Sequence, residues 1–328
     1  MATSIKSISR SRPRRIATTL AIVLAASLVG LAANLAAASI GIAGDAPARL
    51  AAGTLDTAGL GRLALAGAAL LVQPLIVVAL LLAIETWAGP CGRSRKDRHL
   101  AWLVQCLFIT AATLLTLAFG MLGIIPDRPW LGAGEAAGPL MATLQTLAVF
   151  LLAIAVADFL RYWVHRAQHA IPLLWRFHAV HHGPADLDVL HNFIHPVEKL
   201  VNLMLITVPT AFLVGADGGT LFLLAGFFAI QGQLLHMNVP TGYGRFAAII
   251  ADNRFHFVHH SRDPADFNAN YAGVLPVYDR LFGTYRAPRG ETLPPTGLAE
   301  WERPSLADYL LARQSGASRP RRSGIREA

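Results

Sequence analysis

Histidine is distributed very unevenly along this chain. Eleven of its twelve histidines lie between residues 165 and 260. They form the short motifs HRAQH at 165–169, HAVHH at 178–182 and HFVHH at 256–260. Residues three and four apart share one face of an α-helix, so each motif can direct several imidazoles to one side. Imidazole is a common ligand of zinc, copper, iron and nickel, and this spacing therefore predicts metal binding.

The phrase RFHxVHH occurs twice, at 176–182 and 254–260. One metal ion usually takes about four to six ligands, so eight to ten imidazoles are too many for a single ion. Two ions sharing them is the simplest count. Each copy of the phrase would then offer one ion the same set of three nitrogens. Clustered imidazoles also favour the neutral, ligating form, because neighbouring positive charges repel.

Long uncharged segments could hold these motifs at a membrane. The chain is 54% hydrophobic and only 15% charged. About 20 apolar residues cross a bilayer as a helix, and four uncharged segments reach that length: 16–44, 63–84, 100–126 and 136–157. Two further apolar segments, 200–216 and 218–244, are broken by proline and glycine. They predict a hairpin that dips into the membrane and returns, or a shorter pair of spans. We expect an all-α integral membrane protein with about four transmembrane helices and a shallow membrane hairpin, capped by a helical histidine domain.

The net charge of +8 reflects where the arginines and lysines stand. Basic clusters precede the first predicted span, separate the second from the third, follow the fourth and fill the C-terminal tail. Simple alternation of the spans puts all of them on one side, and positive loops stay in the cytoplasm. The charge is thus explained without nucleic acid. The first segment exceeds the core of a signal peptide, about 7–15 residues, so we expect an uncleaved span. Two cysteines predict neither a disulfide framework nor a cysteine-ligated metal.

The same topology lets the motifs converge. We expect the helix of the fourth span to continue to about Ala170, where Pro172 ends it, and a second helix to carry 178–182. The apolar hairpin returns His236 to the cytoplasmic side, and 256–260 follow directly. One face of the first helix then presents Asp158, Tyr162, His165 and His169. A single cytoplasmic site beside the bilayer is the prediction.

With their neighbours, these motifs resemble the fatty acid hydroxylase/sterol desaturase superfamily of integral membrane, non-haem diiron enzymes. The resemblance runs from about Asp158 to Tyr285 and includes DFLRYWVHRAQH, HPVE, QLLHMN and NYAGVLPVYDRLFGTY. The first 135 residues resemble only a generic membrane anchor. We therefore expect three regions: 1–135, an anchor with three spans; 136–287, a fatty acid hydroxylase-like domain; and 288–328, a partly disordered tail.

The resemblance implies metal ligands at particular positions: His165, His169, His178, His181, His182, His195, His236, His256, His259 and His260. It also implies supporting polar residues near the metal at Asp158, Asn238 and Asn270. No catalytic residue is expected beyond the metal centre. Relatives often have an arginine two residues before HP, where this chain has Phe193, and this departure leaves the lipid substrate open.

The implied activity is oxidation of a lipid C–H bond, with hydroxylation favoured over desaturation. It would use two iron ions, O₂ and electrons from a separate cytoplasmic donor, a ferredoxin or a small cytochrome with its reductase. Zinc could replace iron in purified protein. Two alternatives stay open. A membrane zinc hydrolase would need the glutamate of HExxH, whereas Arg166, Ala179 and Phe257 stand there. A metal transporter or haem-binding electron carrier would need histidines at mid-membrane and polar residues within the spans.

Overall fold

The structure is a computed structural model, and it describes residues 53, 56–88, 95–122, 124, 138–215, 218–239, 241–290, 292–298, 301 and 304–313. These residues are helical or irregular, and their only β-pairing is an isolated bridge between Ser261 and Thr296. The all-α class predicted from the sequence is confirmed. The predicted span 16–44 lies outside the described residues.

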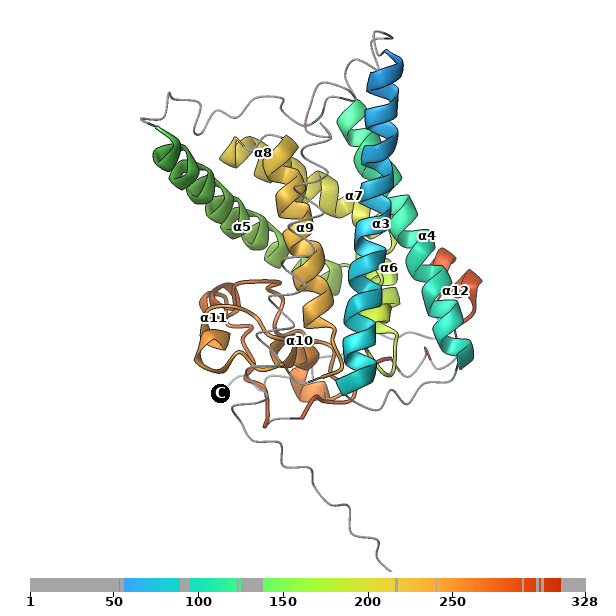
Figure 1. Cartoon of the computed structure of the whole chain (residues 1–328). Coiled ribbons are helices and arrows are strands. Elements are labelled where there is room, and N and C mark those ends of the chain that lie inside the picture. Colours follow the sequence, from blue (N-terminus) through green and yellow to red (C-terminus); the bar gives the residue numbers. More distant parts are fainter. Residues whose placement is uncertain are drawn as a thin grey trace, which may run out of the picture.

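Two long apolar helices pack side by side at one edge of the molecule (Figure 1). They are α3, Thr57–Ala88, and α4, Arg95–Met121. Val78 and Leu81 of α3 are buried in one core with Val104 and Phe108 of α4. That core continues into the cap below, where it includes the residues around the first HxxHH motif.

The helix of the fourth predicted span begins and ends near its expected positions. Helix α5 covers Pro139–Ala170, and α6 covers Pro172–His182. Ile171 between them has an extended backbone, because the residue before a proline is excluded from the helical region. The resulting turn brings the HRAQH end of α5 next to the HAVHH end of α6.

The predicted apolar hairpin corresponds to two helical arms. Helix α7 (Pro196–Asn202), the π-helical segment η2 (Leu203–Thr207) and α8 (Val208–Val214) follow without a break, and α9 (Gly218–Leu235) returns. A π-helical turn shifts the hydrogen-bond register and accommodates Pro209, which lacks an N–H. The first arm therefore forms a continuous helical stretch, and its length and composition are sufficient to cross a membrane.

Three helices among the described residues are long and apolar enough to cross a membrane: Arg98–Phe119, Thr143–Ala170 and Pro196–Val214. The predicted span 63–84 lies in α3, which contains Pro74. The apolar part of α3, Pro74–Ala88, is shorter than these three helices, and so is the apolar helix Leu223–Leu235. The expected count of four spans is thus not confirmed. The outer side chains of the long helices, such as Leu144, Leu147 and Leu151 of α5, are exposed, as lipid contact requires.

Short elements form the cap that carries the remaining histidines. In chain order they are η1 (Val189–His191), η3 (Gly244–Ala248), α10 (Asn253–His259), η4 (Pro264–Asp266), α11 (Val277–Leu281) and α12 (Leu306–Leu311). Asp252 caps α10 by accepting from the backbone N–H of Phe255 at 2.9 Å. Helix α10 lies below the end of α9 (Figure 1), which places the second HxxHH motif beneath the helical layer.

The described part of the C-terminal tail is packed against the cap. Trp301 and Tyr309 are buried in the core shared by α3 and α4. Thr296 accepts from the N–H of Leu187 at 3.1 Å, and the Ser261–Thr296 bridge lies directly after the second histidine motif. The tail thus connects the ends of both HxxHH motifs.

Candidate metal centre

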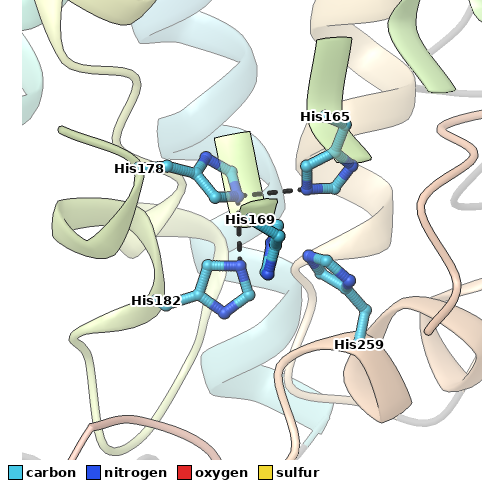
Figure 2. Close-up of side chains that lie close together, drawn as sticks. All are labelled: His165, His169, His178, His182 and His259. Atoms are coloured by element: carbon cyan, nitrogen blue, oxygen red, sulfur yellow. Dashed lines mark hydrogen bonds between the residues drawn. The ribbon is translucent and has the colours of Figure 1, made fainter. Parts of the chain in front are cut away.

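Nine histidines form two groups in which the potential ligand nitrogens all lie within 4.8 Å of one another. Group 1 contains five residues, shown in Figure 2: His165, His169, His178, His182 and His259. Group 2 contains four: His181, His236, His256 and His260. Among the described residues, no cysteine or carboxylate belongs to either group. All-imidazole donor sets suit iron, zinc, copper or nickel.

Each HxxHH motif is divided between the two groups. Its first and third histidines, one helical turn apart, enter one group, and its middle histidine enters the other. His178 and His182 join group 1 while His181 joins group 2. In α10 the assignment is reversed, with His259 in group 1. This differs from the expectation that each motif supplies three nitrogens to one ion.

The nitrogen spacing fits coordination of a common ion. Nε2 of His178 lies 3.0 Å from Nε2 of His165 and 3.1 Å from Nε2 of His182. In group 2, Nε2 of His236 lies 3.2 Å from that of His181 and 3.1 Å from that of His256. Two nitrogens each about 2.1 Å from one metal ion are separated by roughly 3.0–3.4 Å when they occupy neighbouring ligand positions.

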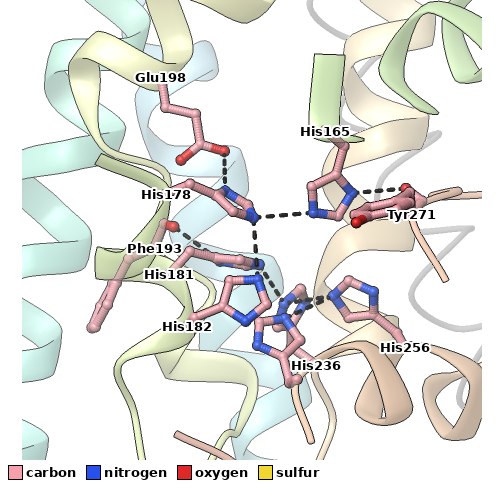
Figure 3. Close-up of polar contacts among 10 residues, drawn as sticks. His165, His178, His181, His182, Phe193, Glu198, His236, His256 and Tyr271 are labelled. Atoms are coloured by element: carbon pink, nitrogen blue, oxygen red, sulfur yellow. Dashed lines mark hydrogen bonds and ion pairs between the residues drawn. The ribbon is translucent and has the colours of Figure 1, made fainter. Parts of the chain in front are cut away.

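The outer ring nitrogens are held by acceptors from several segments (Figure 3). Four Nδ1 atoms meet backbone carbonyl oxygens at 2.5–3.1 Å, pairing His165 with Tyr271, His181 with Phe193, His236 with Gly232 and His259 with Ala269. The fifth, Nδ1 of His178, meets Oε1 of Glu198 at 3.1 Å. A carbonyl or carboxylate oxygen can only accept, so each of these Nδ1 atoms carries the proton.

These outer bonds leave the inner nitrogens available to bind a metal ion and unable to donate hydrogen bonds to one another. A neutral imidazole carries one N–H. With the proton on Nδ1, the facing Nε2 atoms of His165 and His178 are both unprotonated, and so are those of His181 and His236. Two lone pairs that face each other at such distances repel. A cation bound to both removes the conflict, and fixing the far nitrogen is how proteins orient metal-binding histidines.

Protonation is a poor alternative source of that positive charge. Burial, outweighing the bond to Gly232, lowers the pKa of His236 to about 4, and burial lowers the pKa of His259 to about 3. Four buried ring nitrogens have no hydrogen-bond partner: Nδ1 of His256, Nδ1 of His260, Nε2 of His169 and Nε2 of His259. The two Nε2 atoms belong to group 1 and are free to bind an ion. The residues present therefore fit a metal centre.

His195 lies outside both groups, unlike the other nine predicted ligands. Its Nδ1 accepts from the backbone N–H of Val197 at 3.2 Å, at the start of α7. Its Nε2 contacts the carbonyl oxygen of Leu310 at 3.2 Å. Both ring nitrogens are thus engaged in joining α7 to the tail, and we leave His195 out of the proposed ligand set.

The predicted supporting residues hold backbone segments instead of histidines. Asp158 accepts from the N–H groups of Gly273, Val274 and Leu275 at 2.7–3.0 Å. Asn270, with φ of 58°, donates to the carbonyl oxygens of Phe255 and Arg286. Asn238 is bound through its backbone N–H to Glu85 of α3. The first two fix the loop that contains Tyr271, the partner of His165.

Glu198 is the site residue that the sequence prediction omitted. It is buried in α7, and it is the one carboxylate among the acceptors of the nine histidines in the described chain. The signal was present in HPVE, which places a glutamate three residues after His195. The backbone acceptors had no such signal. Phe193 accepts the hydrogen bond from His181 through its backbone carbonyl oxygen. The contact therefore does not depend on the side chain at this position, where relatives often have an arginine.

Fold and site together define an all-helical membrane protein with a paired histidine centre. Comparison with known families agrees. The sequence model of the fatty acid hydroxylase family matches residues 150–284, the stretch that contains all nine grouped histidines. Residues 150–284 are thus similar to the fatty acid hydroxylase family, in agreement with the resemblance carried by the histidine motifs.

Several curated proteins are similar over the same part. Ornithine lipid hydroxylase OlsE of Rhizobium tropici is 34% identical over 138 residues, which are 42% of this chain and 41% of that protein. Human alkylglycerol monooxygenase is 28% identical over 40% of this chain and 29% of its own length. Very-long-chain aldehyde decarbonylase CER1 of Arabidopsis thaliana is 26% identical over 58% and 30%. The chain thus spans less than half the length of these relatives. No solved structure matches.

Proposed function

We propose that this protein is an O₂-dependent lipid hydroxylase of the membrane, with two iron ions held by the nine histidines of groups 1 and 2. The observation that carries the proposal is the pairing of unprotonated Nε2 atoms, 3.0–3.2 Å apart, within two adjacent imidazole groups. Bound iron would supply the O₂ activation that an unreactive C–H bond requires, chemistry that a zinc ion alone does not provide.

The chain's own residues hold and enclose this centre. Carbonyl oxygens and Glu198 keep the Nδ1 protons outward, so that the inner nitrogens stay available. Groups 1 and 2 lie at the ends of α5 and α9, beside exposed apolar helix surfaces. A lipid chain could therefore approach from the bilayer without crossing water. The named activities of the relatives, hydroxylation of ornithine lipids and monooxygenation of alkylglycerols, support a lipid substrate and favour hydroxylation.

The histidine site is proposed to face the cytoplasm. The basic clusters of the sequence fall on the side of the chain to which the predicted topology assigns the histidines, and positive segments are retained in the cytoplasm. A cytoplasmic site gives a separate reductant access to the metal. A hydrolase is disfavoured because Glu198, the one carboxylate bonded to the nine histidines among the described residues, is engaged with the outer nitrogen of His178.

Lipid profiling tests the proposal. Cells with the gene should contain a lipid one oxygen atom heavier than its precursor, and growth under ¹⁸O₂ should label that atom. His178→Ala and His259→Ala should abolish the product while the protein still inserts in the membrane. Oxygen derived from water, or full product in both variants, would contradict the assignment.

A further inference from the structure

Three segments expose large apolar side chains close to one another, away from the histidine groups. They are the C-terminal half of α5, α11 with the residue that follows it, and the region of η3, and we consider two exposed residues from each. Ile249 and Leu281 are 62% and 69% exposed, more than most apolar residues of the candidate spans. We call the set the interfacial surface: Phe159, Trp163, Phe246, Ile249, Leu281 and Phe282.

Side-chain contacts make this surface continuous with the lipid-facing side of α5. The ring of Phe282 lies 4.9 Å from that of Trp163 and 6.3 Å from that of Phe159, centroid to centroid. Helix α11 lies beneath α5 (Figure 1). Arg280 of α11 donates to the carbonyl oxygen of Ala248 at 2.5 Å, which joins α11 to η3. Phe159 and Trp163 belong to the candidate span Thr143–Ala170, so the surface adjoins a membrane helix.

The charges beside the surface are positive. Arg245 and Arg280 are exposed in the two short segments, and Arg166 lies over the ring of Trp163 at 5.5 Å. The one acidic residue within 241–250 and 275–286 is Asp279. Its carboxylate is buried and accepts from the N–H groups of Tyr271 and Ala272. Exposed aromatic and aliphatic side chains next to arginines are typical of segments that lie in an anionic membrane interface.

We infer that the η3 and α11 segments lie in the interfacial layer of the bilayer, with Phe246, Ile249 and Leu281 inserted among lipids and Arg245 at anionic headgroups. The chain continues from Ile250 directly into Ala251, whose N–H donates to the carbonyl oxygen of Val274 at 2.8 Å. The next residue, Asp252, is the N-cap of α10. Membrane contact therefore holds the second histidine motif against the bilayer. This placement of η3 and α11 is independent of the reaction that the histidine centre carries out.

Fluorescence quenching can test this placement in the full-length protein. In a Cys91→Ala, Cys106→Ala background, a bimane label would be attached at Ile249→Cys or Leu281→Cys. Ala265→Cys, exposed in η4, is the matched control. Each protein is reconstituted in nanodiscs of phosphatidylcholine and phosphatidylglycerol. Nitroxide-labelled lipid quenches from the membrane, and acrylamide quenches from water. Circular dichroism and gel filtration verify that each variant is folded.

We expect nitroxide lipid to quench the labels at 249 and 281 at least about two-fold more than the label at 265, with the reverse order for acrylamide. Acrylamide quenching at 249 and 281 equal to that at 265 would overturn the inference. Protection from both quenchers, with a doubled mass in gel filtration, would also overturn it and would identify a second copy of the chain as the partner.

Discussion

His181 and His182 are consecutive residues at the end of α6, but their imidazoles belong to different groups. Their ring centroids lie 5.6 Å apart with planes at 84°. His259 and His260 repeat the relationship at the end of α10, at 5.2 Å and 88°. Successive residues on a helix point about 100° apart, so each HxxHH helix lies between the two groups. Any movement of α6 or α10 must alter both sites together.

Removing ligands from one group should spare the other. The double variant His165→Ala, His169→Ala removes two ligands of group 1, and His236→Ala, His256→Ala removes two of group 2. Each should lose about half of the bound metal, because an ion left with two or three imidazoles lacks its usual four ligands. Metal per chain can be measured by mass spectrometry.

His195→Ala is the control for that experiment. It should retain full metal content and lose about 1 kcal/mol of stability, because its side chain caps α7. Metal loss in His195→Ala as large as in the double variants would refute the ligand set proposed here.

Glu198 should govern metal affinity through His178. Glu198→Ala leaves the Nδ1 proton of His178 without its acceptor, and loss of such an outer partner commonly weakens metal binding about 10–100-fold. Glu198→Gln keeps an acceptor oxygen but loses the negative charge. Its metal affinity should therefore lie between those of the parent protein and Glu198→Ala. Competition with a chelator measures both affinities. The control is Asp263→Asn, which changes an exposed carboxylate paired with Arg289 and should leave the metal affinity at the parent value. Equal affinity in the two Glu198 variants and this control would show that Glu198 does not support the metal site.

The metal-free protein should lose stability as the pH falls from about 7 to about 5. The ordinary pKa of histidine is 6.5, and burial lowers that of His236 to about 4. In this window the unfolded chain binds a proton that the folded chain does not, so stability falls on acidification, by on the order of 2 kcal/mol for His236. Thermal unfolding in detergent with chelator present measures it. His236→Gln should have a shallower dependence, and an unchanged slope would contradict this role of His236.

Contact between the tail and the first histidine motif should be required for stability. A Cβ on Gly183, the residue after His182, would overlap the indole of Trp301. Gly183→Ala should therefore cost about 1–3 kcal/mol by overpacking. In a Trp301→Ala background the same change should cost much less, and denaturant titration of the four proteins gives the coupling free energy. Additive effects would show that the overlap is not the cause.

The histidine spacing, the apolar segments and Pro172 together predicted a helical cap and the break between α5 and α6. Those features depend on local rules: helical periodicity, the length of apolar segments and the backbone of Pro172. Composition also predicted spanning helices, although not their number, because Pro74 interrupts the apolar run of α3 and a π-turn carries the chain past Pro209.

The division of the histidines into groups of five and four was decided only by the tertiary structure. Which nitrogen of a ring faces inward depends on its outer acceptor, and for His165, His181, His236 and His259 that acceptor is a backbone carbonyl. Every residue has a carbonyl group, so the sequence contains no signal for such a partner. His195 is separated from the other nine for a tertiary reason too: the family resemblance implied a ligand there, but packing of α7 against the tail engages both of its ring nitrogens.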